Sequence, residues 1–211
     1  MHPQIHHVPV KTLCCGSSGT GKTTLMIRRI AAADALNVFI FDQAGELTYR
    51  LGLPSLRVDD LTAIADAHRV VCVDPADLHA SDLAAAFEWF CLWVLARSQQ
   101  TPGRKLLVID ELQRLTTTHA DGAPKPFVDI LEIGRRAGLD VLIGSQAPNL
   151  LHNRIRAQIT EVCAFRMIDK RATDWLEPLL TNADDRLRNL PRGLFICRNL
   201  NTGKEIEDDC F

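Results

Sequence analysis

The residues Gly16–Thr23 read G-S-S-G-T-G-K-T, and this stretch determines the architecture. It matches G-x-x-x-x-G-K-[ST], a pattern in which glycines let backbone N–H groups curl around phosphate oxygens. An apolar strand, Val8–Cys15, precedes the loop, and an amphipathic helix, Lys22–Ala35, follows it. Because the N-terminus of a helix attracts anions, this helix completes the site. The sequence therefore predicts a phosphate-binding loop between a strand and a helix.

The pattern also assigns roles to single residues. Lys22 is expected to reach the β- and γ-phosphates of a nucleoside triphosphate, and Thr23 is expected to ligate Mg²⁺. The cofactors implied are ATP and Mg²⁺. The other expected nucleotide contacts come from the loop and the first helical turn: Gly16, Ser17, Ser18, Gly19, Thr20, Gly21 and Thr24.

A second apolar strand, Leu106–Ile109, ends in Asp110 and Glu111. We expect Asp110 to hold the Mg²⁺ through water and Glu111 to polarise a water molecule for attack on the γ-phosphate. Two adjacent carboxylates suit hydrolysis and argue against a small-molecule kinase, which needs no water-activating acid. The alternative is a strand-end acid followed by a glutamate that caps a helix.

A third strand, Val141–Ile143, is followed by Ser145 and Gln146. In ATPases with this kind of loop, such a strand lies beside the phosphate-loop strand, and its polar tip senses the γ-phosphate. Gln146 fits this role by type and position. The alternative interpretation is a polar loop that begins before Pro148.

Arginines offer a further candidate. The helix Phe127–Ala137 contains Arg135 near its end and is closed by Gly138. An arginine can stabilise the charge of phosphoryl transfer across a subunit boundary. Basic residues at a helix C-terminus also complement the helix dipole, and the sequence leaves both interpretations of Arg135 open.

Apolar strands alternate with helices along the rest of the chain. The other expected strands are Val38–Phe41, Val70–Val73 and Val162–Met167, and the other expected helices are Leu61–Ala67, Ser81 (as cap) to Arg97 and Thr173–Leu180. This alternation predicts a parallel sheet covered on both faces. The tail, Gly193–Cys197 and Lys204–Ile206, predicts a terminal β-hairpin. No shift in composition marks a linker, so we expect one domain, 1–211.

Composition bounds the function. The formal net charge is -2, so no global basic field argues for nucleic-acid binding, which would have to be local or created by assembly. The seven cysteines contain no C-x-x-C pair, which predicts buried free thiols in a reducing compartment rather than disulfides or a zinc site. No segment is long and apolar enough to span a membrane and no signal peptide is visible, so we expect an intracellular protein without membrane insertion.

These elements, in this order, resemble the HerA/FtsK superfamily of P-loop ATPases over roughly Val10–Met167. The G-R-R-A-G at 134–138, running into S-Q-A-P at 145–148, is similar to the family's G-R-x-x-G helix end and S/T-Q-x-P strand end. The D-Q-A-G-E at 42–46 is similar to the family's D-x-x-G-E. The resemblance implies an α/β fold of the RecA-like, additional-strand type, with a mostly parallel sheet flanked by helices.

The same resemblance implies roles for the candidate residues. It implies that Lys22 contacts the nucleotide and Thr23 contacts Mg²⁺. Asp110 would be the metal-side acid and Glu111 the catalytic acid. Gln146 would be the sensor, and Arg135 would be an arginine finger acting in trans. The family usually has an arginine where this chain has Ala147. Arg154 and Arg156 are therefore candidates for that missing side chain.

DNA contact is expected just after the catalytic acid. Arg114, His119 and Lys125 lie in or beside a flexible stretch, where the nucleotide state could move a loop that faces a central pore. In a ring each charge is repeated by every subunit, so few charges per chain suffice to meet phosphate backbones. A solvated surface loop is the alternative.

The superfamily pumps double-stranded DNA, usually as ring hexamers, and a bare motor of this length is most similar to the genome-packaging ATPases of the PRD1-like and A32-like viruses. The resemblance therefore implies a Mg²⁺-dependent ATPase that packages a viral genome, in the host cytoplasm and at the virion packaging vertex. Its partners would be double-stranded DNA, further copies of itself, and capsid-vertex or membrane-associated packaging proteins. The alternatives are a HerA- or conjugation-type DNA-transfer ATPase and an ATP-gated assembly factor without translocation. A GTPase is disfavoured because no N-K-x-D guanine reader is present.

Overall fold

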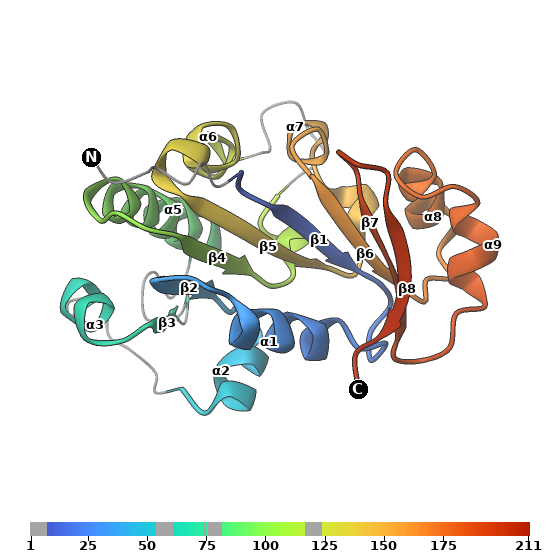
Figure 1. Cartoon of the computed structure of the whole chain (residues 1–211), viewed down its shortest axis with the longest axis horizontal. Coiled ribbons are helices and arrows are strands. Elements are labelled where there is room, and N and C mark those ends of the chain that lie inside the picture. The colour runs from blue at the N-terminus through green and yellow to red at the C-terminus, as the bar shows by residue number, and fades with distance from the viewer. Residues whose placement is uncertain (1–7, 54–60, 74, 76–81, 117–123) are drawn as a thin grey trace.

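The computed structural model describes residues 8–53, 61–73, 75, 82–116 and 124–211. Within these ranges the chain forms one eight-stranded sheet with helices on both faces (Figure 1). The strands are β1 (Lys11–Cys15), β2 (Asn37–Phe41), β3 (Val70–Val73), β4 (Lys105–Ile109), β5 (Leu139–Ser145), β6 (Glu161–Phe165), β7 (Leu194–Asn199) and β8 (Glu205–Asp209).

The helices of the described residues are mostly short, and α5 is the longest of them. The α-helices are α1 (Lys22–Ala32), α2 (Glu46–Leu51), α3 (Leu61–Ala67), α5 (Leu83–Gln100), α6 (Lys125–Ile133), α7 (Asn153–Arg156), α8 (Lys170–Leu176) and α9 (Ala183–Arg188). Within the described residues, three 3₁₀ turns accompany them: η2 (Leu112–Arg114), η3 (Gly134–Ala137) and η4 (Pro148–Leu150). Nowhere in the described ranges does a helix combine the length and the apolar character that a bilayer crossing requires.

The strand order is β3-β2-β4-β5-β1-β6-β7-β8. Pairing is parallel from β3 to β6 and antiparallel from β6 through β7 to β8. The order places β5 between the phosphate-loop strand β1 and the acid-bearing strand β4. This confirms the predicted fold class: a mostly parallel sheet of the additional-strand type with a C-terminal hairpin.

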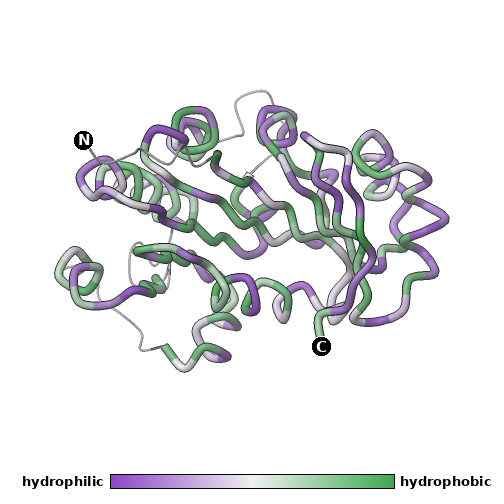
Figure 2. The backbone as a smooth tube through the Cα atoms, viewed as in Figure 1, coloured by the Kyte–Doolittle hydropathy of each residue, from purple (hydrophilic) through white to green (hydrophobic). Residues whose placement is uncertain are grey.

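The core consists of two apolar layers, one on each face of the sheet. Successive side chains of a strand point to opposite faces, so the apolar runs of the central strands serve both layers. One layer packs Cys14, Val38, Ile40 and Val108 against α1 and α2, and the other packs Leu13, Phe39, Phe41 and Ile109 against α3, α5 and α6. Figure 2 shows the apolar residues along the central strands, whereas β8 is largely hydrophilic.

Several element ends differ from the prediction. The expected cap Ser81 lies outside the described residues, and α5 is capped by Asp82, whose side chain accepts a hydrogen bond from the backbone N–H of Ala85 at 3.0 Å. The expected helix Phe127–Ala137 is α6 followed by the turn η3, because the chain tightens at Gly134. The helices α2, α7 and α9 were not predicted.

The cysteine prediction is correct in part. Cys14, Cys15, Cys91 and Cys210 are buried thiols, as expected. Cys163 and Cys197, in contrast, form a disulfide. The expectation of free thiols is wrong for this pair because β6 and β7 place the two residues directly opposite each other, with Cα atoms 4.1 Å apart, a pairing that cysteine spacing alone does not reveal.

Candidate active site

The candidate residues converge because the strands that carry them are parallel. The C-terminal ends of β1, β2, β4 and β5 meet at one edge of the sheet, where ligands bind in open α/β sheets. Phosphate-loop residues follow β1, and the acid pair follows β4. At the tip of β5, Ser145 pairs in register with Cys15 of β1, so Gln146 begins beside the phosphate loop.

The phosphate loop needs its glycines for both conformation and space. Gly16, Gly19 and Gly21 have φ values of 154°, 72° and 122°, which disfavour residues with a Cβ atom. A Cβ on Gly16 would lie 2.6 Å from the Cβ of Phe165, and one on Gly21 would lie 2.9 Å from the Cε1 of the same ring. The loop backbone therefore rests directly on Phe165, the last residue of β6.

Hydrogen bonds hold the loop in a compact curl. The Ser17 carbonyl accepts from the Thr20 hydroxyl at 2.8 Å and from the Lys22 ammonium at 3.0 Å. The Ser17 N–H donates to the Arg166 carbonyl at 3.0 Å, which ties the loop to the end of β6. Ser18 and Gly19 are exposed at the tip of the loop. Thr20 therefore shapes the loop in addition to its expected nucleotide contact.

Lys22 is a buried cation close to the acid pair. Lys22 is only 5 % exposed, and this burial lowers the pKa of its ammonium group. The negative charges of Glu111 and Asp110 act in the opposite direction and raise that pKa. Thr23 follows Lys22 and is half-buried. The Thr24 hydroxyl accepts from the Arg50 guanidinium at 3.1 Å, so α2 reaches the first turn of α1. The predicted nucleotide residues thus lie in one continuous segment that runs from the loop into the first turn of α1.

Glu111 is held by two glutamine side chains. Its Oε1 accepts a 2.5 Å hydrogen bond from the Gln146 amide, and its Oε2 accepts one from the Gln113 amide. Its backbone has φ 52°, a left-handed conformation that is uncommon for a glutamate. The structure therefore joins the predicted catalytic acid at the end of β4 to the predicted sensor at the end of β5.

Asp110 is buried and bonded to its own neighbour. Asp110 is only 4 % exposed, and its Oδ1 accepts a hydrogen bond from the Glu111 N–H at 2.9 Å. Burial raises the pKa of Asp110 to about 6, and the charges of Glu111 and Asp42 add to the rise. The N–H of Glu111 and the charge of Lys22 oppose it. Ionising this buried carboxyl therefore costs free energy, which a nearby cation would offset.

Asp42 and Gln43, which follow β2, were quoted in the sequence motif D-Q-A-G-E but were given no role in the site. The Gln43 amide donates to the carbonyls of Asp110 at 3.0 Å and Glu111 at 3.3 Å, so it supports the backbone of the acid pair. Asp42, 1 % exposed, accepts from the N–H and the hydroxyl of Thr48, both at 2.8 Å. Their position immediately after an apolar strand could have placed them at this edge.

The charge balance of the site fits a divalent cation. The charges of Asp110 and Glu111 act on the buried cation Lys22, and the charge of Asp42 acts on Asp110. The Asp42 Oδ1 and the Ser145 hydroxyl are buried without a hydrogen-bond partner among the described residues. Carboxylate and hydroxyl oxygens are the ligands that Mg²⁺ prefers. The residues present therefore fit Mg²⁺ together with an anionic ligand on the loop.

The shifted carboxyl predicts a pH-dependent effect of Asp110→Asn. Because the folded-state pKa, about 6, exceeds the ordinary 3.8, the folded state holds the extra proton between these values, and stability falls as pH rises through this window. We expect Asp110→Asn to stabilise the metal- and nucleotide-free protein by about 1–3 kcal/mol at pH 7.5 and by much less at pH 4.5. Urea unfolding with a chelator present measures this, with Asp34→Asn, an exposed site, as control. An equal difference at both pH values would contradict the assignment.

Gly144, on β5, predicts a second effect. A Cβ there would overlap the Asp110 carboxylate and lie 3.0 Å from the Met26 sulfur. We expect Gly144→Ala to displace the carboxylate and lower kcat for nucleotide hydrolysis about tenfold or more, since misplaced catalytic groups lose rate steeply. Gly134→Ala is the control, because its nearest contact would be an ordinary 3.6 Å. Steady-state turnover checks both variants, and equal rates would show that Asp110 does not need this space.

Arg135 does not lie in this chain's own site. It is exposed in η3, before β5 begins, whereas the site lies after β5 ends. A strand of this length separates them by about 20 Å. Arg135 and Arg136 line an open pocket of about 1180 Å³ at the opposite edge of the sheet. A catalytic role for Arg135 would therefore require the site of a neighbouring subunit, and this role stays a prediction.

The other candidate arginines already have partners. Arg154 pairs with Glu132 at 2.9 Å, and the Arg156 guanidinium lies 5.3 Å from the centre of the Trp175 ring. Two of the three predicted DNA contacts lie within the described residues. Arg114 is exposed at the end of η2, Lys125 is exposed and pairs with Asp129, and His119 lies outside the described residues.

Comparisons with known proteins agree with this geometry. The model of the Zonular occludens toxin (Zot) family matches residues 12–171. No curated protein sequence matches the chain. Among solved structures, the genome packaging NTPase B204 of Sulfolobus turreted icosahedral virus 2, in complex with ATP-gammaS, is similar with a TM-score of 0.75 at 18% identity, over 95% of this chain and 97% of that chain.

Two further solved structures share the fold over parts of longer chains. The pCW3 conjugation coupling protein TcpA, with ATPgS, has a TM-score of 0.63 at 14% identity, over 95% of this chain and 60% of that chain. Thermomonospora curvata EccC, with a signal sequence peptide, has a TM-score of 0.63 at 15% identity, over 95% and 36%. These likenesses show that the chain shares the fold of these proteins. Since the family model spans more than half of the sequence, from β1 into α8, the chain belongs to the Zonular occludens toxin (Zot) family.

Proposed function

We propose that the chain is a Mg²⁺-dependent ATPase that translocates double-stranded DNA, and that its task is to package a viral genome into a preformed capsid. The observation that best supports hydrolysis is the hydrogen bond from the Gln146 amide to the Glu111 carboxylate beside the phosphate loop. A carboxylate fixed at this point serves as a water-orienting base, for which transfer of phosphate to a metabolite has no need.

The proposed mechanism uses the chain's own groups as follows. The loop N–H groups and Lys22 bind the phosphates, and Lys22 exchanges its bond to the Ser17 carbonyl for a phosphate oxygen. Bound Mg²⁺ would supply positive charge to the transferred phosphate. Glu111 orients the attacking water and accepts its proton, while Gln146 keeps the carboxylate aimed and responds to the γ-phosphate. Thr23 and Asp110 are the proposed metal-side residues.

The motor function is supported by the position of Arg135. An arginine at the sheet edge opposite the nucleotide loop can contribute to hydrolysis only if copies stack head to tail, each offering this edge to the next site. Such heterologous contacts close into rings when the rotation permits. We propose a homo-oligomeric ring, most simply a hexamer, around duplex DNA. The fold match to B204, a packaging NTPase of nearly the same extent, supports the viral role.

The proposed setting follows from that role. The ring would work in the host cytoplasm and at the virion packaging vertex, with capsid-vertex or membrane-associated packaging proteins as partners. Arg114, His119 and Lys125 are proposed to meet the DNA phosphates. Because each subunit repeats these side chains, the net charge of -2 per chain does not prevent a locally basic pore.

A DNA-stimulated ATPase assay tests the proposal. Purified protein should hydrolyse ATP in preference to GTP, and duplex DNA should raise the rate several-fold, less so at high salt. Light scattering with and without ATP should show assembly into a ring. Lys22→Ala is the control for contaminating activity. Turnover that duplex DNA leaves unchanged, together with a monomer under all conditions, would contradict the motor function.

A second candidate is DNA transfer between cells or plasmids. The fold match to the conjugation coupling protein TcpA favours it. Both candidates predict DNA-stimulated turnover, so the distinction needs packaging of labelled duplex into empty capsids of the source virus. ATP turnover without DNA stimulation or movement would instead indicate an ATP-gated assembly factor.

A further inference from the structure

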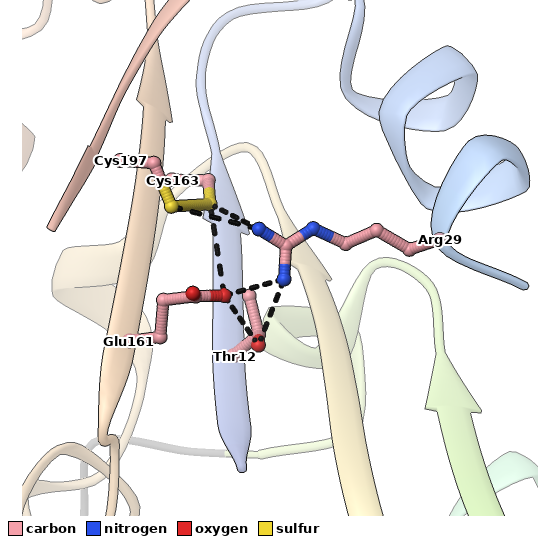
Figure 3. Close-up of a disulfide and its surroundings, with 5 residues drawn as sticks. All are labelled: Thr12, Arg29, Glu161, Cys163 and Cys197. Carbon is pink, nitrogen blue, oxygen red and sulfur yellow. Dashed lines mark hydrogen bonds and ion pairs between the residues drawn. A yellow bond between two sulfur atoms is a disulfide. The ribbon is translucent and has the colours of Figure 1, made fainter. Parts of the chain in front are cut away.

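The disulfide lies directly beneath the helix of the phosphate loop. Cys163 of β6 and Cys197 of β7 face α1, and they are 0 % and 6 % exposed. Figure 3 shows the Arg29 side chain reaching from α1 to both sulfurs and to Glu161. The disulfide therefore links β6 to β7 and packs against α1, the helix that begins at Lys22.

Arg29 places a guanidinium group directly beside both sulfurs of the pair. Its Nη2 lies 3.1 Å from the Cys163 sulfur and 3.5 Å from the Cys197 sulfur, and its Nη1 donates to Glu161 and to the Thr12 hydroxyl. A guanidinium beside sulfur stabilises a thiolate, the form that leaves when a disulfide is reduced. A metal ion held by the two sulfurs and Glu161 would have to displace this cation first.

The same two strands form the floor of the phosphate loop. Phe165 follows Cys163 by two residues, Phe195 precedes Cys197 by two, and the register sets each pair directly opposite. The two rings pack with centroids 5.2 Å apart, and Phe165 lies against Gly16 and Gly21. A shift of the Cys163–Cys197 pair would therefore move the Phe165–Phe195 pair, since both pairs lie on the same face of the β6–β7 ladder.

A second connection runs through the residue before β7. The Gly193 N–H donates to the Thr20 carbonyl at 3.0 Å, so the start of β7 holds the loop directly. The pair is thus connected to the nucleotide loop indirectly, through the Phe165–Phe195 stack, the Gly193–Thr20 bond and Arg29 on α1.

We propose that Cys163 and Cys197 are a redox-active pair whose oxidation state sets the affinity of the phosphate loop for ATP. In reduction, a thiolate of a dithiol reductant attacks the Cys197 sulfur, the more exposed one. The S–S bond breaks, and its electron pair leaves on the Cys163 sulfur beside Arg29, where it takes up a proton. The second thiol of the reductant then displaces Cys197 as a thiol and leaves as a cyclic disulfide. Two electrons and two protons pass in total, and a disulfide oxidant reverses the exchange.

The oxidised state is the one that binds ATP tightly. Two thiols occupy more space than two bonded sulfurs, so reduction spreads β6 from β7 and loosens the Phe165 floor. The effect rests on the ATP binding proposed above, but not on DNA translocation. Coupling between two sites of this kind typically changes affinity by about fivefold or more.

Peptide mapping and ATP binding test the pair in the full chain. After blocking of free thiols, mass spectrometry of the oxidised protein should find Cys163 linked to Cys197. The affinity for ATP is measured by titration in the presence of Mg²⁺. Treatment with a phosphine or dithiol reductant, without a chelator, should weaken this affinity about fivefold or more relative to the oxidised protein. Reoxidation with oxidised glutathione should restore the original affinity. Thermal melting at each state verifies that the protein remains folded at the assay temperature.

Matched variants separate the pair from other thiols. Cys163→Ser/Cys197→Ser and Cys163→Ala/Cys197→Ala should each bind ATP equally with and without reductant. Cys210→Ser, which alters the thiol that lies against Gly21, should keep the wild-type response. Equal ATP affinity of the wild-type protein in both states, or no Cys163–Cys197 linkage after oxidation, would overturn the inference. No ATP binding in either state would instead contradict the proposed function.

Discussion

Glu111→Gln should bind ATP with wild-type affinity and hydrolyse it about 100 to 1,000 times more slowly, since a positioned base contributes rate on this scale. Glutamine keeps the shape of the side chain and can still accept the Gln146 hydrogen bond. It cannot accept a proton, and its new amide would meet the Gln113 amide that now donates to Oε2, so one of the two must turn. Binding and chemistry therefore separate in this variant.

Single-turnover hydrolysis and equilibrium ATP titration measure the two effects independently. Glu88→Gln is the matched control, because it makes the same change at an exposed position of α5, away from the site. The control should retain wild-type kcat. Unchanged hydrolysis in Glu111→Gln would remove this residue from the chemical step and leave it as a structural acid at the end of β4.

Arg135→Ala should lower kcat about 1,000-fold or more in the assembled protein, which is the usual contribution of an arginine supplied by a neighbouring subunit. The nucleotide site of the variant chain itself should remain intact, because the length of β5, about 20 Å, separates position 135 from that site. ATP affinity of the isolated chain should therefore stay near the wild-type value. Arg136→Ala, the adjacent exposed arginine, is the matched control.

Mixing experiments determine whether Arg135 acts across a boundary. Lys22→Ala inactivates a subunit's own site but leaves its Arg135 in place. Assemblies of Arg135→Ala with Lys22→Ala should regain part of the ATPase activity, at interfaces where an intact site meets an intact arginine. Mixed assemblies that remain as inactive as either parent would argue that Arg135 only complements the end of its helix.

Much of the fold and part of the site were predictable because their signals are local. Fully apolar runs ending in polar residues marked the central strands, and the phosphate loop with Asp110–Glu111 indicated which strand ends mattered. Gln146 was correctly placed beside the loop, since β5 pairs with β1. These inferences needed only the alternation of strands and helices and the rule that parallel strands end at a common edge.

What the sequence did not reveal depends on contacts between distant segments. The Gln43 and Gln113 hydrogen bonds to the acid pair require side-chain directions that no periodicity encodes. The helix α2 is bounded by Gly45 and Gly52 without a side-chain cap, so it lacked a start signal. The Cys163–Cys197 disulfide depends on the register of β6 with β7, two strands 34 residues apart at the cysteines.

The left-handed backbone of Glu111 has a consequence for how this protein tolerates change. A residue with a Cβ in this conformation costs about 1 kcal/mol relative to glycine. The substitution Glu111→Gly would relieve this backbone strain, but it would also lose the hydrogen bonds from Gln113 and Gln146 and remove the proposed catalytic acid. Selection for heat resistance alone therefore does not require an acid at this position. Selection must act on turnover at the same time if variants are to keep the acid, and thermostable lineages should be sequenced first at this codon.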